Sequence, residues 1–124
     1  MVDTLGAVKL LIAGGRTFTD YDLLVDEVID FLGTAKLKPT IISGVAAGAD
    51  MLGVRFAREA ELELIPYPAR WDLYGKSAGF RRNLEMADAA TKAIIFWDGK
   101  SKGSEHMINI CKTRGIPYKV VYYR

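Results

Sequence analysis

Short apolar runs recur along the chain, and each is interrupted by glycine, proline or serine. The run "VKLLIAG" (8–14) has no polar alternation apart from Lys9, and "KAIIFW" (92–97) repeats that pattern. Continuous apolar segments of this length are typical of parallel strands buried on both faces. The pattern therefore predicts five strands, at 8–14, 40–43, 62–67, 92–97 and 117–123.

Helical periodicity fills most of the intervals between these runs. In 20–32, Leu24, Val28 and Phe31 fall on one helical face, with Thr19 or Asp20 as the cap and Gly33 at the end. Pro66 cannot donate to a ladder and puts the third strand at an edge of the sheet. Similar periodicity predicts helices at 50–60, 81–90 and 105–115, and a long basic and aromatic loop at 68–80.

The repeated order of strand, glycine-rich turn and helix indicates an α/β protein. Right-handed crossovers make it a small doubly wound fold. We expect a mainly parallel five-stranded sheet with helices on both faces, formed as one domain over residues 1–124.

Composition narrows the function classes. The net charge of +2, from 17 basic and 15 acidic residues, argues against a duplex DNA-binding domain. The single cysteine, Cys111, excludes an internal disulfide and a multi-cysteine metal site, and we read it as a small buried apolar side chain. With no leader and no membrane-spanning run in the sequence, we expect a cytoplasmic protein with no metal and no required cofactor.

Three of the predicted strands end in turns of small residues, at 14–16, 43–48 and 98–104. Ligands of such sheets bind beyond the carboxyl ends of the strands, where helix N-termini offer unpaired amides to an anion. The turns therefore predict a phosphate site. The alternative is that tight strand-to-helix turns require glycine for their own geometry. None of the turns has the spacing of a nucleotide-kinase or dinucleotide-dehydrogenase loop.

Basic residues gather beside these turns. An arginine such as Arg82, next to Asn83, is suited to a forked contact with phosphate. Surface solvation is the alternative for the lysines. The basic residues of these segments are Arg16, Arg70, Lys76, Arg81, Arg82, Lys100 and Lys102.

Four other side chains have two interpretations each. Asp50, in the first turn of its helix, either favours the helix dipole or binds a ribose hydroxyl. Trp71 is a candidate for stacking on a base, whereas Trp97 is more typical of packing. His106, the only histidine, is either a surface residue or a catalytic one.

Four motifs, in this order along the chain, resemble the YspA/YpsA-related branch of the SLOG superfamily. They are "IAGGRTFTD", "SGVAAGAD", "YPARWDLYGKSAGFRRNLEM" and "FWDGKSKGSEHMI". The resemblance implies a Rossmann-like fold and a nucleotide or nucleotide-derived ligand. The superfamily includes Lonely-guy phosphoribohydrolases, proteins that load recombinase on single-stranded DNA, and sensors of NAD-derived signals.

Two departures from the family pattern bear on activity. Val45 stands where the branch has glycine. Phosphoribohydrolases carry a glutamate three residues after a threonine; here Ser104 and Met107 hold those positions, although "RRNLEM" retains the arginine as Arg82. Glu105 would project about 200° away from Met107 on a helix. The resemblance therefore implies a binding site and weakens hydrolysis.

The resulting hypothesis is a protein that senses, carries or sequesters AMP, ADP-ribose, an NAD-related compound or a cyclic nucleotide, and that forms a homodimer or higher homo-oligomer. The alternatives are an N-glycosidase acting on nucleoside monophosphates, with Asp50 or Glu105 as the acid, and a single-strand nucleic-acid binder. The predicted ligand-binding residues are Gly14, Gly15, Arg16, Ser43, Gly44, Gly48, Asp50, Trp71, Lys76, Arg82, Asn83, Asp98, Gly99, Lys102, Gly103, Ser104 and Glu105.

Overall fold

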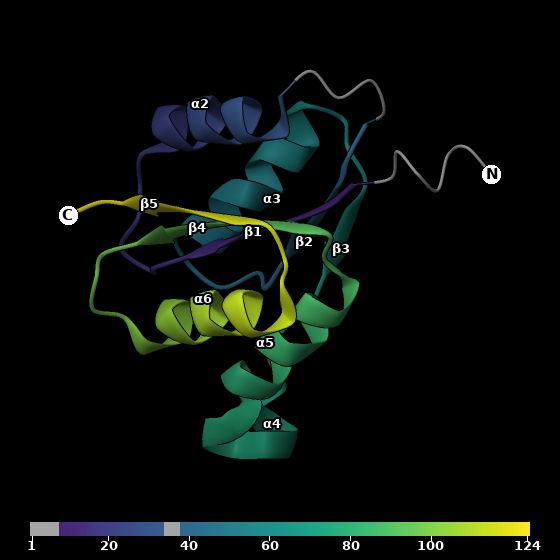
Figure 1. Cartoon of the computed structure of the whole chain (residues 1–124). Helices are drawn as coiled ribbons and strands as arrows, with labels where there is room; N and C mark the ends of the chain where they lie inside the picture. Colours follow the sequence, from purple (N-terminus) through teal and green to yellow (C-terminus); the bar gives the residue numbers. More distant parts are fainter. Residues whose placement is uncertain (1–7, 34–37) are drawn as a thin grey trace.

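The computed structural model describes residues 8–33 and 38–124 and arranges five strands in one sheet (Figure 1). The order across the sheet is β3-β2-β1-β4-β5, and every adjacent pair is parallel. The predicted α/β fold is confirmed, with an all-parallel sheet, and β3 lies at an edge as Pro66 indicated. The strands are β1 (Lys9–Gly14), β2 (Thr40–Ser43), β3 (Leu64–Pro66), β4 (Lys92–Trp97) and β5 (Tyr118–Tyr122).

Helices cover both faces of the sheet. Figure 1 shows α2 (Tyr21–Leu32) and α3 (Ala49–Glu59) on one side, with α5 (Ala78–Ala89) and α6 (Lys102–Arg114) on the other. Two apolar clusters fill the layers between them, and β1 contributes to both. Leu10 and Ile12 face α2 and α3, while Leu11 and Ala13 face α5 and α6. This double burial explains the unbroken apolar run at 8–14.

The predicted boundaries of the first helix are confirmed. The Asp20 side chain accepts a hydrogen bond from the Leu23 amide at 3.1 Å, and Gly33 ends α2 with a φ of 66°. The buried state of Cys111 is also as predicted. Among the described residues no helix is both long and apolar enough to cross a bilayer.

The segment 68–80, predicted as a loop, is largely helical. It contains α4 (Trp71–Tyr74), the 3-10 turn η1 (Gly75–Ser77) and the start of α5 at Ala78, three residues before the predicted start. Glycines and aromatic residues made this segment resemble a loop in sequence, but it forms two short helical turns. They meet at Gly75, which has a φ of 55°. The loop prediction was wrong, and Arg82 and Asn83 lie inside α5 rather than at its start.

Helix α6 likewise begins before its predicted start, at Lys102 rather than residue 105. The Asp98 carboxylate accepts hydrogen bonds from the amides of Lys100 and Ser101, at 2.9 and 2.8 Å. This closes the turn after β4 and allows the helix to start directly.

Candidate functional site

A cavity of about 450 Å³ opens beyond the ends of β1 and β4. The chain crosses from β1 to β2 on one side and reaches β4 on the other, so the strand order reverses at this point. Such a switch point is where open α/β sheets bind ligands. The lining residues are Ala13, Gly14, Gly15, Arg16, Thr17, Ala46, Asp50, Trp71, Lys76, Gly79, Phe80, Arg82, Asn83, Met86, Asp98, Ser101, Lys102, Gly103, Ser104 and Met107.

The loop from β2 to α3 folds around Asp50, which is only 5% exposed. The Ser43 hydroxyl donates to the Asp50 carbonyl at 3.0 Å and accepts from the Val45 amide at 3.1 Å. The Asp50 carboxylate accepts from the Ala46 amide at 3.3 Å. Val45, at the position that the family fills with glycine, has a φ of 52°. Small residues thus allow the loop to wrap around a carboxyl group at the cavity.

The environment of Asp50 shifts its protonation equilibrium. Burial raises the pKa of Asp50 to about 6, although the Arg82 guanidinium and the Ala46 and Gly14 amides act in the opposite direction. A carboxyl group with such a pKa holds its proton in part near neutral pH. Asp50 therefore differs from an ordinary ionised carboxylate that only favours the dipole of α3, because it is buried and can carry a proton.

Arg82 binds the protein rather than standing free in the cavity. Its Nη1 donates to the carbonyls of Gly44 and Tyr67, at 2.6 and 3.3 Å. A Cβ atom at Gly44 would lie 2.4 Å from that nitrogen, so Gly44 makes room for the guanidinium. Arg82 lines the cavity, whereas Ser43 and Gly44 do not. For Ser43 and Gly44, the predicted phosphate contact is replaced by a role in building the loop.

Gly48 joins two loops and does not line the cavity. It has a φ of 83°, and a Cβ atom there would lie 2.3 Å from the Gly15 carbonyl oxygen. The adjacent Ala49 amide donates to the same oxygen at 3.1 Å. The close approach of the two backbones therefore requires glycine at position 48. This agrees with the alternative interpretation, in which the turns need glycine for their own geometry.

Asn83 connects α5 to α6. Its Oδ1 accepts from Arg82 Nε at 3.2 Å, and its Nδ2 donates to the Gly103 carbonyl at 3.2 Å and lies 3.1 Å from His106 Nδ1. Asn83 is 6% exposed. Its amide therefore orients Arg82 within the protein, and a phosphate contact of Asn83, which lines the cavity, stays a prediction.

His106 lies behind the cavity wall rather than among its lining residues. Its ring packs against Phe80, with 4.4 Å between the ring centroids, and burial lowers the pKa of His106. His106 is half-buried on α6 and its contacts are those of a packing residue, while a catalytic role for it stays a prediction.

The start of α6 brings the predicted residues Lys102, Gly103 and Ser104 to the cavity. Glu105 lies outside the cavity lining, and its carboxylate lies 3.9 Å from Lys102 Nζ. Met107 is buried at the cavity wall. The divergence of neighbouring α6 side chains thus removes Glu105 from the predicted site, and Gly99 also lies outside the lining.

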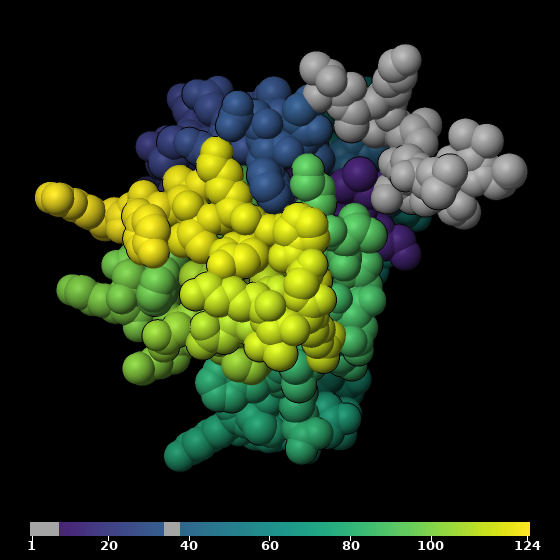
Figure 2. Space-filling view, viewed as in Figure 1, coloured from purple at the N-terminus to yellow at the C-terminus, as the bar shows by residue number. Residues whose placement is uncertain are grey.

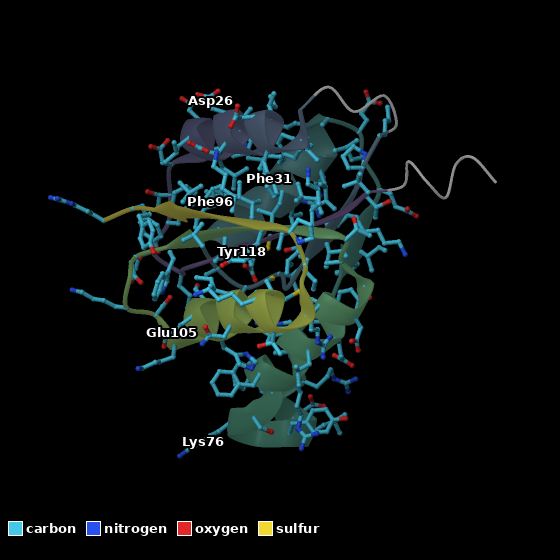
Figure 3. All side chains as sticks on the ribbon, viewed as in Figure 1. Asp26, Phe31, Lys76, Phe96, Glu105 and Tyr118 are labelled. Carbon is cyan, nitrogen blue, oxygen red and sulfur yellow. The ribbon has the colours of Figure 1, made fainter. Side chains whose placement is uncertain are left out.

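The outer rim of the cavity is exposed and basic. Arg16 lies in the loop after β1, and Lys76 projects from the far end of the α4–η1 segment (Figure 3). Trp71 is 53% exposed and Phe80 is 47% exposed. This rim combines cations and aromatic rings, whereas Arg70, Arg81 and Lys100 lie outside it.

Eight lining residues were absent from the predicted site. Thr17 and Ser101 lie within or next to the glycine-rich turns, so the turns themselves carried a signal for them. Phe80 and Gly79 belong to the segment predicted as a loop, and Ala46 lies in the second turn. Ala13 and Met86 come from the ends of buried faces and had no distinguishing signal, whereas Met107 holds the position at which the phosphoribohydrolases carry their glutamate.

Comparison with known proteins gives the family. The model of the YspA, cpYpsA-related SLOG family matches residues 8–74, which include the β1–α2 and β2–α3 loops and α4. The chain belongs to this SLOG family. The Gene 61 protein of Mycobacterium phage D29 is a relative with 32% identity over 115 residues, covering 88% of this chain and 92% of that protein. No solved structure matches this SLOG protein significantly.

Proposed function

We propose that the cavity binds a nucleotide-derived ligand. The observation that carries this proposal is the meeting of basic side chains with small-residue turns and exposed aromatic rings at the switch point of the sheet. In this proposal the phosphate lies between the Gly15–Arg16 turn and the start of α6, near Lys102. The base lies against Trp71 and Phe80.

The size of the cavity supports a small ligand. A volume of about 450 Å³ is in the range of small-molecule sites and well below what an extended polymer needs. AMP, ADP-ribose, NAD-related compounds and cyclic nucleotides are the candidates. Membership of the SLOG family supports the same class. The protein would sense, carry or sequester the ligand.

A thermal-shift screen with these compounds tests the proposal. A ligand at about one hundred times its dissociation constant adds about 2.7 kcal/mol, which raises the melting temperature of a domain of this size by roughly 3–6 °C. Chromatography of each mixture then reports whether the ligand is intact. No shift with any compound would contradict the proposal.

Matched variants locate the ligand. We expect Trp71→Ala to weaken binding of the stabilising compound roughly tenfold through lost stacking. Leu73→Ala, in the same short helix and 60% exposed but outside the cavity, should leave affinity unchanged. Lys102→Ala should reduce both affinity and its salt dependence, whereas Lys112→Ala at the other end of α6 should do neither. Equal effects within either pair would contradict this placement.

A second candidate, N-glycosidic hydrolysis, is favoured by one observation: Asp50 is a buried acid at the cavity with a pKa of about 6. Water would add to the ribosyl C1 and the bond to the base would break. The Asp50 acid would give its proton to the leaving nitrogen, and its carboxylate would then take up the proton that the water loses. Incubation with AMP should then release adenine and ribose 5-phosphate. Activity should be lost in Asp50→Asn and retained in Glu105→Gln, and intact AMP would exclude this candidate.

A further inference from the structure

An exposed apolar patch extends from the cavity mouth over α4 and α5. Of the eight large apolar side chains exposed among the described residues, five lie between residues 71 and 84. Neither α4 nor η1 contains a buried residue. Figure 2 shows this segment as a teal-green lobe at the lower end of the molecule. The patch residues are Trp71, Leu73, Tyr74, Phe80 and Leu84.

The patch continues along the outer face of α5 in an ordered sequence of charge. Helical spacings of one, three and four residues place the exposed side chains of α5 on one face. They are Phe80, Arg81, Leu84, Glu85 and Asp88. The first turn of this face is basic at Arg81, the middle is apolar at Leu84, and the end is acidic at Glu85 and Asp88. One helix face therefore carries both halves of a complementary charge pattern.

We propose that this face packs against the same face of a second copy of the chain, with the two α5 helices antiparallel. A two-fold axis near Leu84 brings Arg81 opposite Glu85 and Asp88 of the second copy, and the reverse pair forms by symmetry. The two Leu84 side chains then cover one another at the axis. Opposite charges at the ends of an apolar centre also fix the antiparallel direction.

Contacts within the chain hold the charges of this face in place. Arg81 Nε donates to the Ser77 hydroxyl at 3.0 Å, and its guanidinium lies 4.5 Å from the centre of the Tyr74 ring. Asp88 pairs with Arg114, whereas Glu85 has no ion pair within residues 8–33 and 38–124. A restrained arginine therefore loses little conformational freedom when it meets the unpaired Glu85 of a second copy.

The same surface borders the ligand cavity. Trp71 and Phe80 belong both to the patch and to the cavity lining. A second copy on this face therefore narrows the mouth of the cavity. The pairing depends on the exposed face alone and does not require the proposed nucleotide ligand.

Light scattering coupled to size exclusion, over a range of protein concentrations, tests the pairing. We expect twice the monomer mass for the unmodified chain and the monomer mass for Leu84→Arg. Ile29→Arg is the matched control, because Ile29 is an exposed apolar residue of α2 that is 56% exposed against 41% for Leu84. A monomeric unmodified chain, or a dimer that survives Leu84→Arg, would overturn the proposal.

Charge reversal provides a test that does not depend on the apolar centre. Arg81→Glu and Glu85→Arg should each raise the dimer dissociation constant roughly tenfold, because each brings like charges together across the axis. The double variant should restore most of the affinity. Circular dichroism checks that each variant is folded. Additive loss in the double variant would overturn the proposed antiparallel arrangement.

Discussion

The floor and the rim of the cavity are built in opposite ways. The floor residues Asp50, Arg82 and Asn83 are engaged by hydrogen bonds within the protein, and Ser43, outside the lining, bonds the Asp50 carbonyl. On the rim, Trp71, Lys76 and Lys102 are exposed to solvent. Substitutions on the floor should therefore change the stability of the fold, while substitutions on the rim should change ligand affinity alone.

The largest effect on stability is expected at Gly48, where the β2–α3 loop meets the β1–α2 loop. Gly48→Ala combines a left-handed backbone with a Cβ atom 2.3 Å from the Gly15 oxygen, and should lower the free energy of unfolding by about 3 kcal/mol or more. Gly99 has a positive φ of 82° but no atom within 4 Å of its Cβ position, so Gly99→Ala should lower the free energy of unfolding by about 1 kcal/mol.

Gly103→Ala completes this series, because Gly103 has neither a positive φ nor an atom within 4 Å of its Cβ position. It should be neutral or slightly stabilising. Urea unfolding of the three variants measures the order. Equal losses at Gly48 and Gly103 would mean that the contact between the loops is unimportant.

Asp50 should make stability depend on pH. Its pKa rises from 3.8 to about 6 on folding, so the folded state binds more protons than the unfolded state between these values. The contribution of Asp50 to stability is then greatest below about pH 4 and falls, by about 3 kcal/mol in total, as pH rises through 6. Urea unfolding at a series of pH values, in the unmodified chain and in Asp50→Asn, measures the difference. A difference that is constant with pH would contradict the raised pKa.

Loss of Arg82 should have a smaller effect on stability. Arg82→Ala removes charge-assisted hydrogen bonds to the Gly44 and Tyr67 carbonyls and should cost about 2 kcal/mol. It should also raise the pKa of Asp50 further, because the Arg82 guanidinium is the largest influence that lowers it. Arg58→Ala, on the exposed side of α3, is the control and should stay within about 0.5 kcal/mol.

The smallest stability effects are expected on the rim. Lys76→Ala and Arg16→Ala should each change the free energy of unfolding by less than about 0.5 kcal/mol, since both side chains are exposed. Titration with the compound identified by thermal shift should nevertheless show weaker binding in both. A large loss of stability in either variant would remove the distinction between floor and rim.

Sequence patterns predicted the fold well because the strands and the longer helices are encoded locally. The apolar run at 8–14 and the cap at Asp20 need no information from elsewhere in the chain. The cavity floor is different, because Arg82 meets Gly44 across 38 residues of sequence. Glycine in a turn looks the same whether it faces a ligand, an arginine or another backbone, so the roles of Gly44 and Gly48 could not be separated.

The segment 68–80 shows a second reason for failure. Short helical turns such as Trp71–Tyr74 have no periodicity to detect. Glu105 shows a third: its position depended on where α6 begins, and that start is set by hydrogen bonds to Asp98.

The central place of β1 also affects how the chain is made. Its first residue, Lys9, bonds Thr91 across 82 residues, and β1 is completed only by pairing with β4. During synthesis on the ribosome, the edge of β1 that pairs with β4 therefore stays unpaired until residues 92–97 have emerged. Nascent chains of this protein should consequently engage chaperones at that edge until residues 92–97 arrive.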